Sequence, residues 1–284
     1  PTWWITGLAF GTEVGHKLFV LLHFVVGFAG LFRAARRLYG ASPPAAALSA
    51  LAWAFGGYFA WRAAGGHATF LAFHYLPWIL LCWRRAHEAP RYAVPVALWM
   101  TLVLLEGGTY AFPLSFLFLG VDSLASLAAR RWAVLRTALL AAPLTALLGA
   151  IRLVPIARIL ERFPRQTRLE DAQSFEALLE SLTAREPQPW RWEQTWVWGE
   201  YGSYLGFAGL ALAGYGALVA PRRRAAHLIV GALVFGACSM GNRGPLWPWP
   251  LLHQLPLFGN LHVPSRFHVL LTFHLALLAG LALD

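Results

Sequence analysis

The chain has 284 residues, of which 58% are hydrophobic and 13% charged, whereas soluble domains contain about 25% charged residues. This composition excludes a soluble protein. The net charge of +10 does not indicate a nucleic-acid partner either, because the arginines form short clusters between long apolar blocks and not a polar surface.

Nine apolar blocks follow one another along the chain, and most approach the length of about 20 residues that a helix needs to cross the hydrocarbon core. They cover residues 14–38, 43–61, 68–83, 92–105, 111–129, 133–156, 203–220, 225–240 and 267–283. Several contain proline or glycine, which membrane helices tolerate when neighbouring helices satisfy the backbone. The sequence therefore predicts an all-α fold, a polytopic transmembrane bundle of about eight or nine helices in a single domain, 1–284.

Arginine clusters follow every second block, and such clusters mark the cytoplasmic ends of membrane helices. They comprise Arg33, Arg36, Arg37, Arg84, Arg85, Arg91, Arg130, Arg131, Arg136, Arg222, Arg223 and Arg224. This alternation, with an arginine- and alanine-rich composition typical of GC-rich bacterial genomes, predicts a multi-pass protein of the bacterial cytoplasmic membrane. The first block would then run from outside to inside, so we expect an earlier crossing upstream and a chain truncated at both ends.

Two external loops stand out. The first, at about 157–202, contains the capping-box pair Thr167 and Glu170 and then apolar residues at helical spacing from Phe175 to Leu182, which predict a short interfacial helix. Four tryptophans follow at positions suited to the lipid headgroups or to substrate stacking, namely Trp190, Trp192, Trp196 and Trp198. The second loop, at about 241–266, is rich in proline and tryptophan, so we expect no regular helix there but a stiff gate or a packing segment.

Charged and aromatic polar residues gather at the predicted outer ends of the blocks, where they should face protein or a water-filled cavity. They include Lys17, Arg62, His67, Glu106, Arg152, Glu200, Tyr201, His262 and Arg266. Several cations beside apolar walls suit a phosphate carried on a lipid, because arginine grips phosphate oxygens bidentately. The structural alternatives are a simple Glu13–Lys17 pair and ion pairs of Glu106 and Glu200 with Arg62, Arg152 or Arg266.

Metal-ligand spacings such as HExxH do not occur, so the sequence predicts no metal site. For the histidines within the blocks, His23, His74, His268 and His274, hydrogen-bonded interior positions are the favoured interpretation. Asp122 lies towards the cytoplasmic side and is expected to bond a neighbouring helix.

An ordered series of segments resembles the bacterial YfhO-like membrane proteins, which belong among the GT-C-type glycosyltransferases. The segments are LLHFVVGFAGLFRAARRLYG, AAALSALAWAFGGYFA, GGHATFLAFHYLPWILL, EYGSYLGFAGLALAG and NLHVPSRFHVLLTFHLALLAGLAL. Together they extend over nearly the whole chain.

The resemblance implies an inverting enzyme that moves a sugar from a polyprenyl-phosphate donor to an envelope glycopolymer or lipid acceptor on the outer face of the membrane. It also implies a catalytic acid in the first external loop, which is expected upstream of residue 1, so Glu106 is the acid candidate within the chain. Cations such as Lys17, Arg62, Arg152 and Arg266, or a divalent metal, would stabilise the departing phosphate. The competing interpretations are a transporter or flippase of a lipid-linked or anionic solute, and a non-catalytic envelope-assembly protein.

Overall fold

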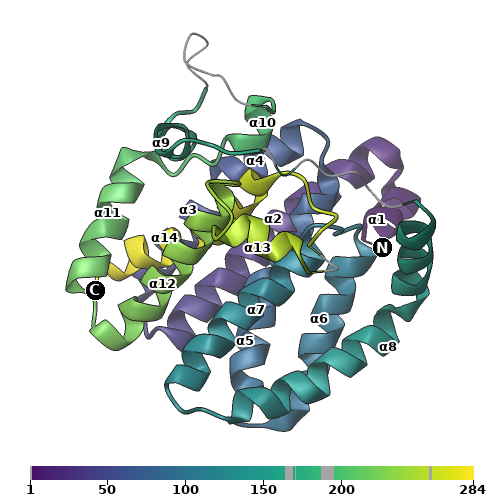
Figure 1. Cartoon of the computed structure of the whole chain (residues 1–284), viewed down its shortest axis with the longest axis horizontal. Coiled ribbons are helices and arrows are strands. Elements are labelled where there is room, and N and C mark those ends of the chain that lie inside the picture. Colours follow the sequence, from purple (N-terminus) through teal and green to yellow (C-terminus); the bar gives the residue numbers. More distant parts are fainter. Residues whose placement is uncertain (1, 164–168, 170, 187–194, 256–257) are drawn as a thin grey trace. The chain divides into compact units, whose positions relative to one another are not determined.

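The computed structural model describes residues 2–163, 169, 171–186, 195–255 and 258–284. Helices dominate these residues (Figure 1), and the described part of the chain contains one isolated β-bridge, Ala172 with Gly241, and no strand. The predicted all-α class is confirmed. The chain divides into two compact units, Pro1–Gly40 with His67–Pro164 and Ala41–Gly66 with Arg165–Asp284.

The first unit is built around the long helix α2. Its elements are α1 (Thr2–Phe10), α2 (Thr12–Leu38), η1 (Ala68–Tyr75), α5 (Leu76–Ala86), η2 (Pro90–Tyr92), α6 (Ala93–Leu105), α7 (Ala111–Ala128) and α8 (Ala133–Arg162). Helix α2 packs against α1, η1 and α5, and α6 packs against α5 and α8.

The second unit is built around the last helix, α14. Its elements are α3 (Pro43–Ala54), α4 (Gly57–Ala64), α9 (Phe175–Thr183), α10 (Trp198–Tyr201), α11 (Gly206–Val219), α12 (Arg222–Ser239), α13 (Pro248–His253), η3 (Pro264–Phe267) and α14 (His268–Leu281). Helix α14 packs against α3, α11 and α12. Its apolar residues surround the whole helix, which is the pattern of a helix buried on all sides.

Small residues allow the neighbours of α14 to approach its backbone closely. Gly216 of α11 lies against the backbone of Leu278, and Gly280 of α14 itself lies against Ser49 of α3. Close contacts through small residues are a usual means of packing helices in membranes, where no hydrophobic driving force acts between them.

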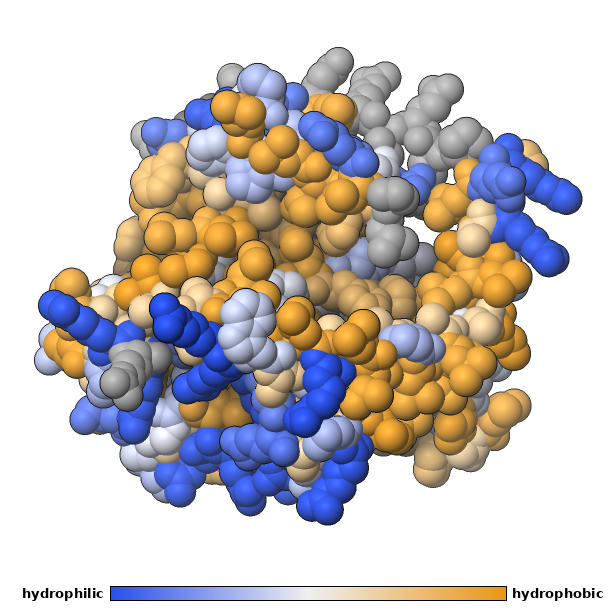
Figure 2. Space-filling model, turned by 60° about the horizontal axis from the view of Figure 1, so that its bottom comes forward, coloured by the Kyte–Doolittle hydropathy of each residue, from blue (hydrophilic) through white to orange (hydrophobic). Residues whose placement is uncertain are grey.

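Five helical segments in the described part of the chain are long and apolar enough to cross a membrane, and two further apolar helices are shorter. The five are Thr12–Leu38, Ala111–Ala128, Ala133–Arg162, Trp198–Val219 and Pro264–Leu281, and the shorter two are Pro90–Leu105 and Arg224–Ser239. Large apolar side chains also remain exposed, and Figure 2 shows broad hydrophobic surfaces on the face that it presents. Surfaces of this kind suit contact with lipid. The chain is a multi-pass membrane protein.

Two of the predicted blocks are not continuous α-helices. The block at 43–61 is divided into α3 and α4 at Gly56 and Gly57, where the Gly57 amide donates to the Tyr204 carbonyl over 3.0 Å. A side chain at position 57 would collide with Tyr204, so glycine permits this contact. The block at 68–83 begins as the 3₁₀ helix η1, and Pro77 stands in the first turn of α5, where its missing N–H costs no helical hydrogen bond.

The predicted interfacial helix corresponds to α9, in which Leu178 and Leu182 are buried. Ser174 caps it, because its side chain accepts a hydrogen bond from the Ala177 amide. The pair Thr167 and Glu170, together with Trp190 and Trp192, lies outside the described residues.

The expectation that 241–266 contains no regular helix is wrong over α13. Pro248 and Pro250 both fall in its first turn, where the backbone N–H groups have no intrahelical partner in any case.

Candidate functional site

A buried carboxylate flanked by two arginines lies where α4, α10 and η3 of the second unit meet. Arg62 Nη1 lies 2.7 Å from Glu200 Oε2, and Arg62 Nη2 donates to the Glu200 carbonyl over 3.1 Å. Arg266 binds the same carboxylate bidentately, through Nε at 3.0 Å and Nη2 at 2.8 Å. Ser265 also donates to the Glu200 carbonyl, so this residue is held by its side chain and its backbone.

The cluster of Arg62, Glu200 and Arg266 has an excess of positive charge, because two guanidinium groups share one carboxylate. Their exposure differs: the side chain of Arg62 is 1% exposed, that of Glu200 7% and that of Arg266 11%. Arg62 also lies over the Tyr58 ring, 4.9 Å from its centroid, as in a cation–π contact. Arg62 is therefore the fully buried cation of the cluster, and Arg266 is the more exposed one.

A second polar layer supports the backbone beside Glu200. His268 Nδ1 donates to the Tyr201 carbonyl over 3.0 Å, and Gln173 Nε2 lies 2.9 Å from His268 Nε2. Ser203 Oγ lies 3.2 Å from His268 Nδ1. The interior, hydrogen-bonded position predicted for His268 is what the structure shows, and this histidine positions the Glu200–Tyr201 segment.

Asp171 belongs to the same unit and was not anticipated from the sequence. Its Oδ2 accepts a hydrogen bond from the indole of Trp196 over 3.0 Å, and the Trp196 ring lies 5.6 Å from the ring of His262. The segments predicted to form the two external loops therefore meet through Asp171, Trp196 and His262. The sequence signal for Asp171 was weak. Asp171 and Gln173 stand at alternate positions just before the Ser174 cap, and the segment has no hydrophobic periodicity.

Glu106, the predicted acid, lies in the first unit and is 9% exposed. It accepts hydrogen bonds from the Thr2 amide at 3.0 Å and the Thr2 hydroxyl at 2.5 Å, with the Tyr75 hydroxyl at 3.5 Å. His23 packs against Tyr75 with ring centroids 5.2 Å apart. Neither Thr2 nor Tyr75 was among the predicted site residues, because Thr2 precedes the first apolar block and a single hydroxyl group such as that of Tyr75 carries no spacing signal.

The other cations of the first unit make separate contacts. Lys17 pairs with Glu13 at 2.7 Å, and both side chains are more than 70% exposed, which corresponds to the simple i, i+4 pair named above as the alternative. Arg152 donates to the Leu105 carbonyl over 2.8 Å and so caps the end of α6. His67 is exposed at the start of η1.

The structure thus brings Arg62, Glu200 and Arg266 together, with Tyr201 adjacent in sequence. The ion-pair alternative describes Glu200 well. Among the described residues, no group of three or more His, Cys, Asp or Glu side chains could hold a metal ion.

Comparison with known proteins adds evidence about the fold. No protein-family model and no curated protein sequence matches the chain. Among solved structures, the fold is similar to that of ArnT from Cupriavidus metallidurans, which was crystallised bound to undecaprenyl phosphate. The TM-score is 0.60 and the sequence identity 17%, over 100% of this chain and 48% of ArnT. The chain therefore has a GT-C-like membrane fold and spans about half the length of that protein.

Proposed function

We propose that this chain is part of a membrane glycosyltransferase that takes its sugar from a polyprenyl-phosphate carrier and transfers it to an envelope glycopolymer or lipid. The likeness to the fold of ArnT, a protein seen with undecaprenyl phosphate, supports this proposal, and so does the resemblance to YfhO-like proteins. The observation that carries it is the cluster of Arg62, Glu200 and Arg266.

The positive excess of this cluster matches the charge that develops in the reaction. When the bond between the anomeric carbon and the phosphate oxygen breaks, its electron pair leaves with the phosphate, while the acceptor oxygen forms the new glycosidic bond and loses its proton. A guanidinium beside the leaving oxygen stabilises that charge. Arg266 is proposed for this role, because Glu200 fixes its orientation and it retains some exposure.

Binding of polyprenyl phosphate to the purified full-length protein tests this assignment. Arg266→Gln is expected to weaken binding by about tenfold or more, since a charge-assisted hydrogen bond contributes roughly 1.5–3 kcal/mol. Arg266→Lys should be intermediate, because lysine keeps the charge but loses the bidentate geometry. Arg243, exposed in the same external loop, provides the control Arg243→Gln. Equal binding by Arg266→Gln and Arg243→Gln would remove Arg266 from the site.

Glu106 is proposed as the proton acceptor for the acceptor hydroxyl within this chain. Glu106→Gln keeps an oxygen for the Thr2 hydrogen bonds but cannot take a proton, so transfer should fall by about 10²–10⁴-fold with donor binding unchanged. Glu161→Gln, an exposed site near the end of α8, is the matched control. Normal turnover by Glu106→Gln would mean that another residue accepts the proton, and Asp171 would be the next residue to test.

A further inference from the structure

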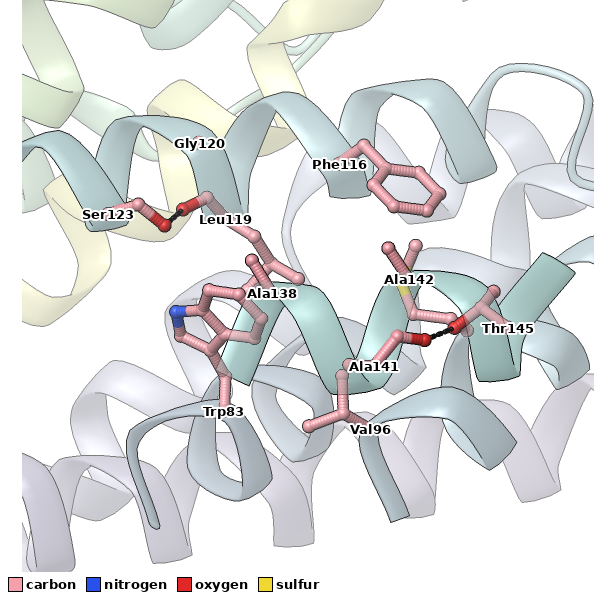
Figure 3. A pocket seen from close by; sticks show the side chains of 11 residues that line it. Trp83, Val96, Phe116, Leu119, Gly120, Ser123, Ala138, Ala141, Ala142 and Thr145 are labelled. Carbon is pink, nitrogen blue, oxygen red and sulfur yellow. Dashed lines mark hydrogen bonds between the residues drawn. The ribbon is translucent and has the colours of Figure 1, made fainter. Parts of the chain in front are cut away.

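An apolar groove lies within the first unit. It has a volume of about 180 Å³ and is bounded by α5, α6, α7 and α8. Figure 3 shows Phe116 and Leu119 of α7 opposite Ala138 and Ala142 of α8, with Trp83 below. An apolar cavity of about 150 Å³ is large enough to bind a small hydrocarbon such as benzene, so this groove can hold a segment of a lipid chain.

The lining is predominantly apolar, and its polar side-chain groups are the indole N–H of Trp83 and the hydroxyl groups of Ser123 and Thr145. The hydroxyl groups of Ser123 and Thr145 donate to the carbonyls of Leu119 and Ala141 in their own helices, as the dashed lines in Figure 3 mark. Helix α8 forms one wall, and only 17% of its most apolar 18-residue stretch is buried within the protein. A hydrocarbon chain entering from the bilayer is the guest that these walls suit.

One end of the groove is strongly cationic. Trp83 and Ala138, which line it, lie next to segments 84–91 and 130–136, which together contain six arginines and one acid, Glu88. Arg136 donates to the His87 carbonyl over 3.1 Å, so it joins the two segments. Arg84 is bound to Asp122 of α7. With two acids against six arginines, this end attracts anions.

The pKa of His87 agrees with this arrangement. Burial, followed by the neighbouring charges of Arg84, Arg131 and Arg136, lowers this pKa to about 4. The charges of Arg84 at the end of α5, Arg131 before α8 and Arg136 in the first turn of α8 therefore act together on His87, which stays neutral at pH 7.

Arg130 occupies a position where glycine would be less strained. It follows α7 with a positive φ of 57°, and the Arg130 and Arg131 amides bond the Leu127 and Ser126 carbonyls, as in a Schellman motif. A left-handed conformation costs a non-glycine residue roughly 1–2 kcal/mol. Binding of an anion by the Arg130 guanidinium would offset this conformational cost.

We propose that this groove is a binding site for an anionic phospholipid of the cytoplasmic leaflet. One acyl chain lies between α7 and α8, and the phosphate lies among Arg130, Arg131 and Arg136. Basic pockets between membrane helices on the cytoplasmic side bind anionic headgroups by the same physical means. The site is independent of the proposed transferase function and of the cluster around Glu200.

Native mass spectrometry of the full chain in detergent, titrated with phosphatidylglycerol or phosphatidylcholine, tests this proposal. Phosphatidylglycerol should bind more tightly. Each of Arg131→Gln and Arg130→Gly should reduce its affinity by about fivefold, since a basic residue near an anionic headgroup contributes about 1 kcal/mol. The paired variant Arg222→Gln/Arg224→Gln, in the arginine cluster of the second unit, is the control and should bind as the unchanged protein does.

The groove itself is tested at Gly120. A Cβ atom there would meet nothing within 4 Å, so Gly120→Ala should largely retain tight phosphatidylglycerol binding, while the longer side chain of Gly120→Leu should occupy the groove and abolish it. Equal binding of the two phospholipids, or tight binding that survives Gly120→Leu, would overturn the proposal. So would selective retention of polyprenyl phosphate in place of phosphatidylglycerol.

Discussion

Replacing Glu200 with glutamine is expected to destabilise the protein by about 3–5 kcal/mol. The carboxylate binds two guanidinium groups, and the side chain of Arg62 is only 1% exposed, so the substitution leaves a buried cation without its counter-charge. Removing one partner of a buried ion pair has costs of this order. Thermal or denaturant unfolding of the purified protein in detergent measures the change.

The matched comparison is Glu13→Gln, which breaks the exposed pair with Lys17 and should change stability by about 0.5 kcal/mol or less. A second comparison is the double variant Arg62→Met/Glu200→Gln, which removes the buried cation together with its partner. Its loss of stability should be clearly smaller than the sum of the two single losses, because the residues are coupled. Additive losses would contradict the ion-cluster interpretation.

Gly216→Ala is the second substitution for which a large effect is expected. A methyl group at this position would collide with the backbone of Leu278, so α11 and α14 would have to move apart. Forcing extra atoms into a packed contact costs about 1–3 kcal/mol or more. Thermal unfolding in detergent should show a clear loss of stability.

Gly214 of the same helix is the internal control, since a methyl group there meets nothing within 4 Å. Gly214→Ala should leave stability unchanged or raise it by up to about 1 kcal/mol, because alanine favours the helix. Equal effects at positions 214 and 216 would mean that helix propensity, and not the contact with α14, controls this site.

The ion cluster connects stability with the proposed chemistry. Glu200 holds Arg266 by two hydrogen bonds, so a loss of transfer in Glu200 variants has two physical sources, a misplaced Arg266 and a weakened fold. Measuring polyprenyl-phosphate affinity and thermal stability in the same variants separates them. Arg266→Lys is informative here, because it alters the geometry with the net charge unchanged.

The helical, membrane-spanning character of the chain follows from composition and from the spacing of apolar blocks. Both are local properties: a long run of apolar residues must satisfy its own backbone in lipid, and a helix does so without any distant partner. Similarly, the i, i+4 pair of Glu13 and Lys17 and the helix α9 were predictable, since each depends on residues a few positions apart.

The contacts between distant segments could not be predicted from the sequence. Nothing in the spacing of Arg62, Glu200 and Arg266 indicates that the three share one site, because α4, α10 and η3 meet only through folding. The same holds for the Thr2 contact with Glu106 and the division of block 43–61 around Tyr204. Hydrophobicity determines which segments enter the membrane, but the partner of each polar group depends on how closely the helices approach, and single glycines such as Gly57 and Gly216 control that approach.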